Sequence, residues 1–295
     1  MDGVIVIDKP SGMTSHDVVN RVRRILQEKS VGHLGTLDPM ATGVLPMVVG
    51  RMTRLAQFYT ASDKTYIGEI RFGISTTTYD ADGDPIREMP FENVAIDRIR
   101  ETAGAFVGKI QQVPPPFSAK KIAGVPAYKL ARKNKEVELK PVEVEVKRFE
   151  IGELEADRAQ FVCEVSSGTY VRSIAHELGG RLGCGAHLSS LRRTVSGEFR
   201  VEDAITLEAL DAAVKNETAP QVFVHPRRLL PELPSVTADE ENVAKIRHGR
   251  AVNLPEYSRA RLVKVFQGQT ELIAIAIRVA GTLFHPKVVL TEAAR

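Results

Sequence analysis

The amino-acid sequence predicts an α+β fold, with a small strand-rich domain at the C-terminal end. Strand-like and helix-like segments follow each other in mixed order, without the steady βαβ alternation of a doubly wound fold. Prolines at positions 220, 226, 231 and 234 then separate a main part from a tail that holds only short strand-like segments. We therefore expect domains at 1–232 and 233–295, with an insertion at about 109–141.

Apolar periodicity predicts the individual elements of the main part. A helix is expected to begin at Thr14 and Ser15, which can cap it, and to run to about Glu28, because the apolar residues up to Leu26 share one face. Alternating or continuous apolar residues predict strands, and a period near 3.6 predicts helices. The expected strands are 4–7, 44–49, 66–72, 142–146 and one from 161, and the further helices are 94–106, 171–182 and 207–214.

The tail is expected to form a small β-barrel of about 60 residues. Its strand-like segments are 251–254, 261–266, 272–277 and 287–290, and glycines at 249, 268 and 281 lie between or before them. The segment 32–43 of the main part fits neither helix nor strand periodicity, so we expect a loop there.

Composition restricts the class of protein. The chain of 295 residues is 43% hydrophobic and 26% charged, which is ordinary for a globular protein. Two cysteines are too few for a disulfide framework. The apolar stretch at the N-terminus is too short for a signal peptide, and no apolar run approaches the length of about 20 residues that spans a membrane. We expect a cytoplasmic protein without membrane contact.

Charge is unevenly distributed, although the net charge is only +3. The stretch 109–135 holds seven lysines and arginines and no acid, while 136–157 holds eight acids. This segregation indicates a local surface for a polyanion, or a solvated loop with a chance bias. Our hypothesis is that the lysines of this stretch bind the backbone of such a polyanion.

Several cofactor and metal motifs fail on inspection. Asp80, Asp82 and Asp84 have the spacing of a calcium loop, but Pro85 occupies its glycine position and Phe91 its glutamate position. The chain has no phosphate-binding loop and no convincing dinucleotide fingerprint. We expect no cofactor and no metal, so the chemistry must come from side chains.

Asp38 is the carboxylate that draws attention. It lies among small residues, between Gly35 and Gly43, and Pro39 fixes the chain just after it. Small neighbours allow a flat ligand to approach the backbone. An aspartate before a proline is more often a turn residue, so this stretch alone leaves both interpretations open.

The surrounding motif resembles the signature loop of the TruB family, the bacterial tRNA pseudouridine-55 synthases. Further stretches match that family in order, from residue 3 to about 200. The similar stretches are Gly32–Leu45, Lys9–Ser15, Lys64–Tyr66, Asp80–Gly83, Gly168–Ser173, Gly185–Leu188 and Leu191–Thr194. The tail, with Ile246–Gly249 and His285–Val288, is more weakly similar to a PUA RNA-binding module.

This resemblance implies a pseudouridine-synthase core with a mixed, mainly antiparallel sheet and a C-terminal PUA-like domain. It implies that Asp38 is the catalytic carboxylate, which must be ionised, and that Arg172 pairs with it. We expect this cation to lower the pKa of the carboxylate. Tyr66 would stack on the uracil, and the acceptor of the C5 proton stays open, with Tyr66 as a candidate. The expected substrate-binding residues are His33, Tyr170, Leu191, Lys64 and Lys9, the two lysines serving phosphates or loop structure.

The implied reaction is isomerisation of uridine 55 in the T-loop of tRNA, after the base is flipped out of its stack. Attack at the ribose C1′, attack at the uracil C6 and a glycal route all stay open. One alternative is a non-catalytic protein that binds or folds tRNA, and another is a hydrolase with an aspartate nucleophile. We expect a monomer that needs tRNA, through its T-arm, and no obligate protein partner.

Overall fold

The computed structural model describes residues 1–91, 94–115, 117, 121–122, 125–126 and 140–291, and it confirms the α+β class. Nine strands form the main sheet, in which every pairing is antiparallel except that of β3 with β12. The sheet is therefore mixed and mainly antiparallel, as expected. In spatial order its strands are β1 (Gly3–Lys9), β3 (Thr42–Val49), β12 (Ala186–Ser196), β4 (Lys64–Phe72), β11 (Arg158–Val165), β10 (Val142–Glu155) and β7 (Gly108–Gln112), with β2 (Val31–His33) beside β3 and β13 (Phe199–Arg200) beside β12.

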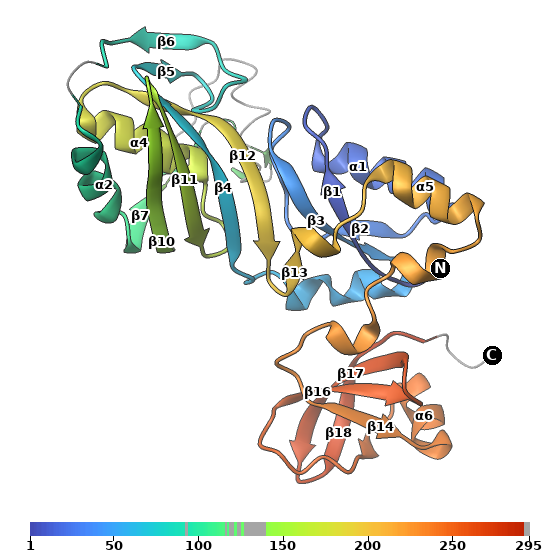
Figure 1. Ribbon diagram of the computed structural model, residues 1–295. Coiled ribbons are helices and arrows are strands. Elements are labelled where there is room, and N and C mark those ends of the chain that lie inside the picture. The colour runs from blue at the N-terminus through green and yellow to red at the C-terminus, as the bar shows by residue number, and fades with distance from the viewer. Residues whose placement is uncertain (92–93, 116, 118–120, 123–124, 127–139, 292–295) are drawn as a thin grey trace.

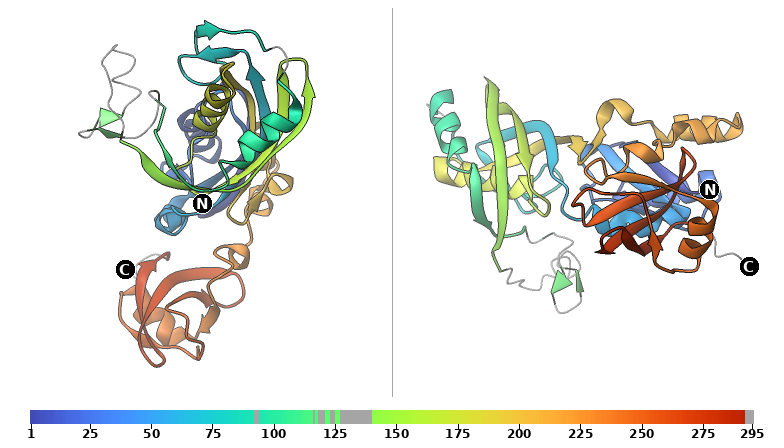
Figure 2. Two further views of the ribbon diagram at one scale, coloured as in Figure 1. Left: turned by 90° about the vertical axis from the view of Figure 1, so that its left-hand side faces the viewer. Right: turned by 90° about the horizontal axis from the view of Figure 1, so that it is seen from below.

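Helices cover one face of this sheet at each of its two ends (Figures 1 and 2). At one end α2 (Ile96–Gly104) and α4 (Val171–Leu182) pack on β10 and β12, and the sheet curves around them. At the other end α1 (Ser15–Leu26) packs against α5 (Leu207–Lys215) beside β1 and β2. The described part of the chain also contains short 3-10 segments, namely η1 (Gly50–Phe58), η2 (Val201–Asp203), η3 (Ala219–Val222) and η4 (Pro226–Arg228).

The helix at the N-terminal end forms where its caps and periodicity predict. Thr14 caps α1 by accepting a hydrogen bond from the backbone N–H of Asp17, and the Asp17 carboxylate accepts one from the N–H of Thr14 in return. The apolar face of α1 is buried against the sheet in one continuous core that extends to α4. This packing fixes the start of α1 next to the loop that carries Asp38.

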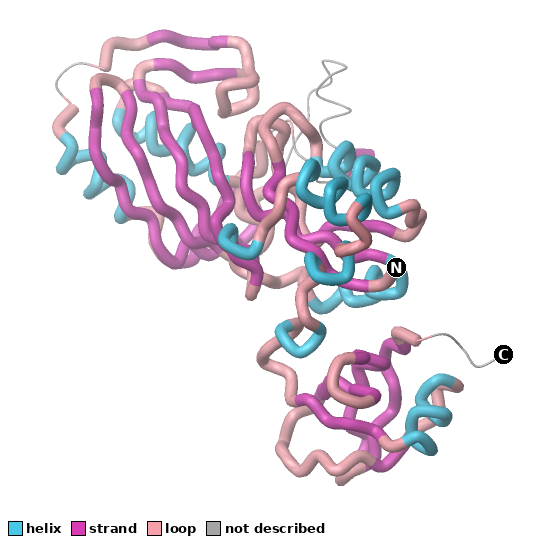
Figure 3. The backbone as a smooth tube through the Cα atoms, turned by 45° about the vertical axis from the view of Figure 1, so that its right-hand side comes forward, coloured by secondary structure: helices cyan, strands magenta, loops and turns pink. Residues whose placement is uncertain are grey.

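The C-terminal part is a separate five-stranded sheet with one helix (Figure 3). Its strand order is β14 (Ser235–Ala238), β16 (Leu262–Gln267), β17 (Glu271–Ala280), β18 (Leu283–Val289) and β15 (Val252–Asn253). Helix α6 (Glu240–Arg247) begins after its cap residue Asp239. Neither α6 nor β14 was expected from the sequence, because this stretch is polar and contains few apolar residues with a clear periodicity. The sheet is an open half-barrel, so the expected small β-barrel is confirmed only in part.

Part of the expected insertion at 109–141 belongs to the main sheet, since β7 pairs with β10 along its whole length. The hairpin of β8 (Lys121–Ile122) and β9 (Val125–Pro126) follows, and a second hairpin, β5 (Ile74–Thr76) with β6 (Pro85–Glu88), lies at the end of β4. Residues 118–120 and 127–139, which hold most of the lysine-rich stretch, lie outside the described residues. Within the described part of the chain, no helix has both the length and the apolar character needed to cross a membrane.

Candidate active site

The loop that carries Asp38 connects β2 with β3, and a buried lysine holds it from behind. Lys9, at the end of β1, is 0% exposed. Its ammonium group donates hydrogen bonds to the carbonyls of Pro10, Pro39 and Ala41, at 2.8, 3.1 and 2.7 Å. Burial lowers the pKa of Lys9 to about 8. Because all three donor positions are used inside the protein, Lys9 serves the structure of the loop, which is one of the two roles expected for it.

A buried arginine holds the same loop from the other side. Arg193 on β12 is 1% exposed, and its guanidinium donates to the carbonyls of Val44 at 2.7 Å, Gly35 at 3.1 Å and Thr36 at 3.4 Å. A buried carbonyl that lacks a hydrogen-bond donor destabilises the fold, and this single side chain supplies donors to three carbonyls. The sequence analysis included Arg193 in a matching motif but assigned it no role.

Gly43 allows the two strands beside the loop to approach closely. Its φ is 98°, and a Cβ atom at this position would lie 2.2 Å from the carbonyl oxygen of Arg193. Here β3 and β12 pair in parallel, with Arg193 opposite Gly43. A side chain would force the strands apart and displace the guanidinium that binds the loop.

Asp38 and Arg172 form the ion pair that the family resemblance implies. The Nη2 atom of Arg172 donates to Oδ1 of Asp38 at 3.0 Å. Arg172 is the second residue of α4 and its side chain is 5% exposed, whereas that of Asp38 is 33% exposed. The guanidinium is thus enclosed, while the carboxylate reaches toward solvent. Arg172 Nη2 also donates to the carbonyl of Phe117 at 3.0 Å, and this second hydrogen bond fixes the orientation of the guanidinium group.

A second carboxylate shares this guanidinium. Asp80 is buried, and its Oδ2 lies 3.5 Å from Arg172 Nη1, which also contacts the carbonyl of Thr78 at 3.4 Å. One cation therefore faces two acids. The sequence analysis noted Asp80 only within a motif. The general rule that a buried arginine needs acidic partners could have suggested a second acid, but no local pattern identifies which one.

The pKa of Asp38 lies above the ordinary aspartate value, contrary to our expectation. Burial raises it most, and Arg172 acts in the opposite direction. The negative charges of Asp80 and Asp82 add to the upward shift. The sequence analysis considered only the cation; removal of the carboxylate from water and the neighbouring acids outweigh it.

These groups line a small cavity of about 230 Å³. Six of the eight residues predicted for the site are among its walls: Asp38, Lys64, Tyr66, Tyr170, Arg172 and Leu191. They come from the loop after β2, from β4, from the start of α4 and from β12. The remaining walls are Gly35, Thr36, Leu37, Ser166, Ser167, Gly168, Thr169, Val171 and Arg193.

Tyr66 and Lys64 lie on the same face of β4. Tyr66 is 8% exposed, and its phenol lies near the guanidinium of Arg193. Burial raises the pKa of Tyr66, while the charge of Arg193 opposes that rise. The ammonium group of Lys64 donates to the carbonyl of Ser62, and burial lowers the pKa of Lys64 to about 8.

Tyr170 and Leu191 lie at the cavity as expected, and His33 lies beside it. The N–H of Tyr170 donates to Oε1 of Gln112 at 2.8 Å, which ties the start of α4 to β7. Leu191 on β12 is 8% exposed. His33 ends β2, and its Nδ1 accepts a hydrogen bond from the N–H of Gly35 at 3.3 Å. It is not among the cavity walls. Burial lowers its pKa, so the ring is neutral at pH 7.

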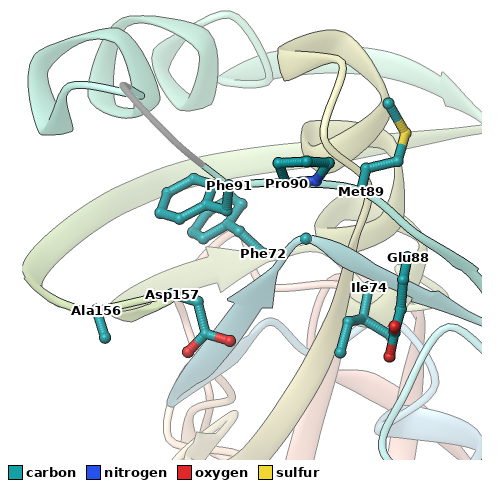
Figure 4. Close-up of a pocket in the computed structure, with 9 residues that line it drawn as sticks. Phe72, Ile74, Glu88, Met89, Pro90, Phe91, Ala156 and Asp157 are labelled. Atoms are coloured by element: carbon teal, nitrogen blue, oxygen red, sulfur yellow. The ribbon is translucent and has the colours of Figure 1, made fainter.

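Larger hollows lie away from Asp38, and two of them exceed 600 Å³. One, shown in Figure 4, has about 660 Å³ and is lined by residues 72–74, 88–91 and 156–157. Phe91 stacks on Phe72 there, and Asp157 is paired with Arg71. None of its described walls is a cation. The other, of about 740 Å³, lies over residues of β4, β10, β11 and β12. Its Glu69 pairs with Arg158 and its Arg192 with Asp8, but neither guanidinium is enclosed as that of Arg172 is. The small cavity, whose walls include Asp38 and the enclosed Arg172, is therefore the candidate active site.

Comparison with known proteins agrees with this geometry. Residues 23–171 match the model of the TruB family pseudouridylate synthase N-terminal domain, and residues 172–231 match the tRNA pseudouridylate synthase B C-terminal domain. The chain is 50% identical over 293 residues to tRNA pseudouridine synthase B of Solibacter usitatus, covering 98% of this chain and 100% of that protein. It is 39% identical to the protein of the same name from Geobacter sulfurreducens, covering 95% of each.

Solved structures show the same fold. The chain is similar to a chain of an archaeal box H/ACA sRNP Nop10–Cbf5 complex and to a chain of a Cbf5–Nop10–Gar1 complex. The matched chains have TM-scores of 0.72 and 0.73 and are 28% and 29% identical. The alignments cover 99% of this chain and 86% and 85% of those chains. Together with the family models and the curated relatives, these matches establish that the chain belongs to the TruB family of pseudouridylate synthases, which are isomerases.

Proposed function

We propose that this enzyme converts uridine 55 in the T-loop of tRNA into pseudouridine, with Asp38 as the catalytic carboxylate. The observation that carries the proposal is the ion pair of Asp38 with the enclosed Arg172 at a cavity wall. The relatives that match almost the full chain bear the name tRNA pseudouridine synthase B, which supports tRNA as the substrate.

The proposed reaction is an isomerisation that needs no second reactant and no cofactor. The bond between N1 of the uracil and C1′ of the ribose breaks, and a bond between C5 and C1′ forms. C5 loses a proton and N1 gains one, so the atoms balance. Ionised Asp38 promotes the cleavage as a nucleophile or by stabilising developing positive charge, and Arg172 holds the carboxylate in position.

The remaining cavity walls suit a detached base that must turn before it bonds again. Extrusion of a stacked nucleotide costs a few kcal/mol, which contacts in a pocket must offset. The ring of Tyr66 can supply about 1–3 kcal/mol by stacking on the base. Leu191 and Tyr170 would form further walls, and Lys64 would serve a phosphate or the structure of the loop. His33, which lies beside the loop, is proposed to contact RNA around the extruded base.

We also propose that residues 233–295 form a PUA-like RNA-binding domain. The five-stranded sheet with α6 supports this, as do the exposed His248 and Arg250 after α6. The chain is proposed to act as a monomer without an obligate protein partner. With tRNA as substrate, the proposed location is the cytoplasm.

Product mapping tests the proposed function. A full-length tRNA transcript is incubated with the purified enzyme, and nucleosides are analysed by mass spectrometry with mapping of position 55. We expect pseudouridine at position 55, unchanged RNA mass and no free uracil. Release of uracil would indicate a hydrolase, and tight binding without any conversion would indicate a tRNA-binding or tRNA-folding protein. A transcript with cytidine at position 55 is the control and should yield no pseudouridine.

A further inference from the structure

Tyr79, in the turn after β5, has an unusual backbone conformation. Its φ is 67°, in the left-handed region that favours glycine and disfavours bulky side chains. Two hydrogen bonds hold it there: its N–H donates to the carbonyl of Thr76 at 3.2 Å, and its carbonyl accepts from the N–H of Leu188 at 3.0 Å. Such a conformation persists only where the surroundings fix it, and it often accompanies a functional site.

The two neighbours of Tyr79 both contact Arg172. The carbonyl of Thr78 lies 3.4 Å from Arg172 Nη1, and Oδ2 of Asp80 lies 3.5 Å from the same nitrogen. The hydroxyl of Thr78 also donates to Oδ1 of Asp80. Because Tyr79 separates these two residues, its φ determines how their acceptor atoms are spaced around one guanidinium nitrogen.

The side chain of Tyr79 contacts the helix that carries Arg172. Its ring stacks on that of His176, with centroids 3.8 Å apart and planes inclined by 12°. His176 lies four residues after Arg172 on α4, one helical turn further along the same face. Nδ1 of His176 is buried and makes no hydrogen bond to the described residues. Burial lowers the pKa of His176, so it stacks as a neutral ring at pH 7.

We propose that the stacked rings of Tyr79 and His176 position Arg172, and through it Asp38. The stack fixes the turn at 76–80 against α4, so that Thr78 and Asp80 occupy Nη1 of Arg172 and leave Nη2 for Asp38. Without the stack, the strained backbone of Tyr79 relaxes, both acceptors shift, and the guanidinium turns away from Asp38. This inference rests on the proposed roles of Asp38 and Arg172.

Steady-state kinetics with a tRNA transcript tests the proposal. For Tyr79→Ala and His176→Ala we expect kcat to fall by about 10- to 100-fold, since a displacement of about 1 Å in a catalytic group can have that effect. KM should change less than about twofold, because the stack is not proposed to contact RNA. Tyr79→Phe and His176→Phe keep two flat rings and should retain kcat within about twofold. The double alanine variant should be no slower than either single variant.

The pH profile separates positioning from a merely structural role. Arg172 opposes the rise in the pKa of Asp38, so displacing it should move the acidic limb of kcat to higher pH in both alanine variants. Stoichiometric tRNA binding gives the folded fraction to which kcat is normalised. A lower melting temperature with unchanged kcat and unchanged acidic limb would overturn the proposal, as would additive losses or failure of the phenylalanine variants to restore activity. If Asp38→Asn turned over normally, the proposed function itself would fail, a result that these variants cannot produce.

Discussion

At the scale of single residues, the site is governed by competition for one guanidinium. Arg172 faces Asp38 and Asp80; the side chain of Asp80 is buried, and that of Asp38 is about two-thirds buried. Burial therefore raises the pKa of Asp38, although a cation lies 3.0 Å away. The proposed reaction needs the ionised form of Asp38, so its acidic limit should lie above the ordinary range of an aspartate.

A pH profile tests this electrostatic account. Asp82 is exposed and its charge raises the pKa of Asp38, so Asp82→Asn should move the acidic limb of kcat toward lower pH. The shift should be a few tenths of a pH unit at low ionic strength and should shrink in about 1 M salt, where screening is strong. Asp84→Asn is the matched control, because Asp84 is not among the charges that act on Asp38. An unchanged limb at low salt would contradict the account.

The same shift predicts the stability of the catalytic variant. A carboxyl whose pKa is higher in the folded state than in the unfolded state stabilises the fold below its unfolded pKa of about 3.9, and this contribution is lost as pH rises through the folded value. At pH 7 the ionised Asp38 therefore costs stability. We expect Asp38→Asn to melt at the same temperature as wild type or higher, with the difference shrinking as pH falls. Calorimetry checks this, and a clear drop in melting temperature at pH 7 would refute it.

At the scale of elements, the start of α1 anchors the catalytic loop. The hydroxyl of Ser15 accepts from the N–H of Leu37 at 2.8 Å and donates to its carbonyl at 3.1 Å. Both groups are buried. The residue before it, Thr14, caps the helix without touching the loop. The helix terminus and the loop can therefore be perturbed separately.

Two neighbouring substitutions use this difference. Ser15→Ala leaves the Leu37 N–H without its partner, so we expect a loss of about 1–3 kcal/mol in the free energy of unfolding together with a lower kcat. Thr14→Ala removes a cap and should cost about 1 kcal/mol while kcat stays close to wild type. Urea unfolding and steady-state kinetics measure both effects. Equal kcat in the two variants would show that the anchor has no influence on Asp38.

Elements with strong local signals were predictable from the sequence. The cap at Thr14 and one apolar face gave α1 to within two residues, and α4 was expected at 171–182, where it lies. Helix α6 was not predicted, because its local sequence pattern is weak and the helix is stabilised by the tertiary packing of Val243 and Ile246.

The site was predictable only where the family motifs reach. The structure brings six of the eight expected residues to one cavity. It places Lys9 behind the loop, where it binds carbonyls, a role that depends on which backbone groups become buried in the fold. The contact of Asp80 with Arg172 and the contacts of Arg193 with the loop also depend on which groups the fold buries. The spacing of residues in the sequence does not predict them.

At the scale of the whole molecule, the C-terminal sheet shares a core with the main sheet. Val6, Val44 and Leu55 of the main part cluster with Phe266 and Ile275 of the tail. Polar contacts cross this junction: Nη1 of Arg54 donates to the carbonyl of Val289 at 2.6 Å, and Nζ of Lys264 donates to the carbonyl of Leu229 at 2.7 Å. Two parts joined by a common core are expected to unfold together.

A substitution in this junction tests the coupling. Leu230 is 2% exposed, and Leu230→Ala should lower the free energy of unfolding by about 2–5 kcal/mol. The chain has no tryptophan, so far-UV circular dichroism and hydrogen exchange are the suitable probes. We expect one transition, with protection lost to the same extent in β4 and β17. Separate transitions, with only the tail destabilised, would show that the two parts are independent.

The most direct test of the central claim is tritium release from a tRNA transcript labelled at C5 of its uridines, with wild type and Asp38→Asn compared under single-turnover conditions. Formation of the C5–C1′ bond must expel the tritium. The proposed role of Asp38 predicts that wild-type enzyme releases the label from one uridine per tRNA, whereas Asp38→Asn binds the transcript equally well and releases none. Release by Asp38→Asn at a rate near that of wild type would contradict it.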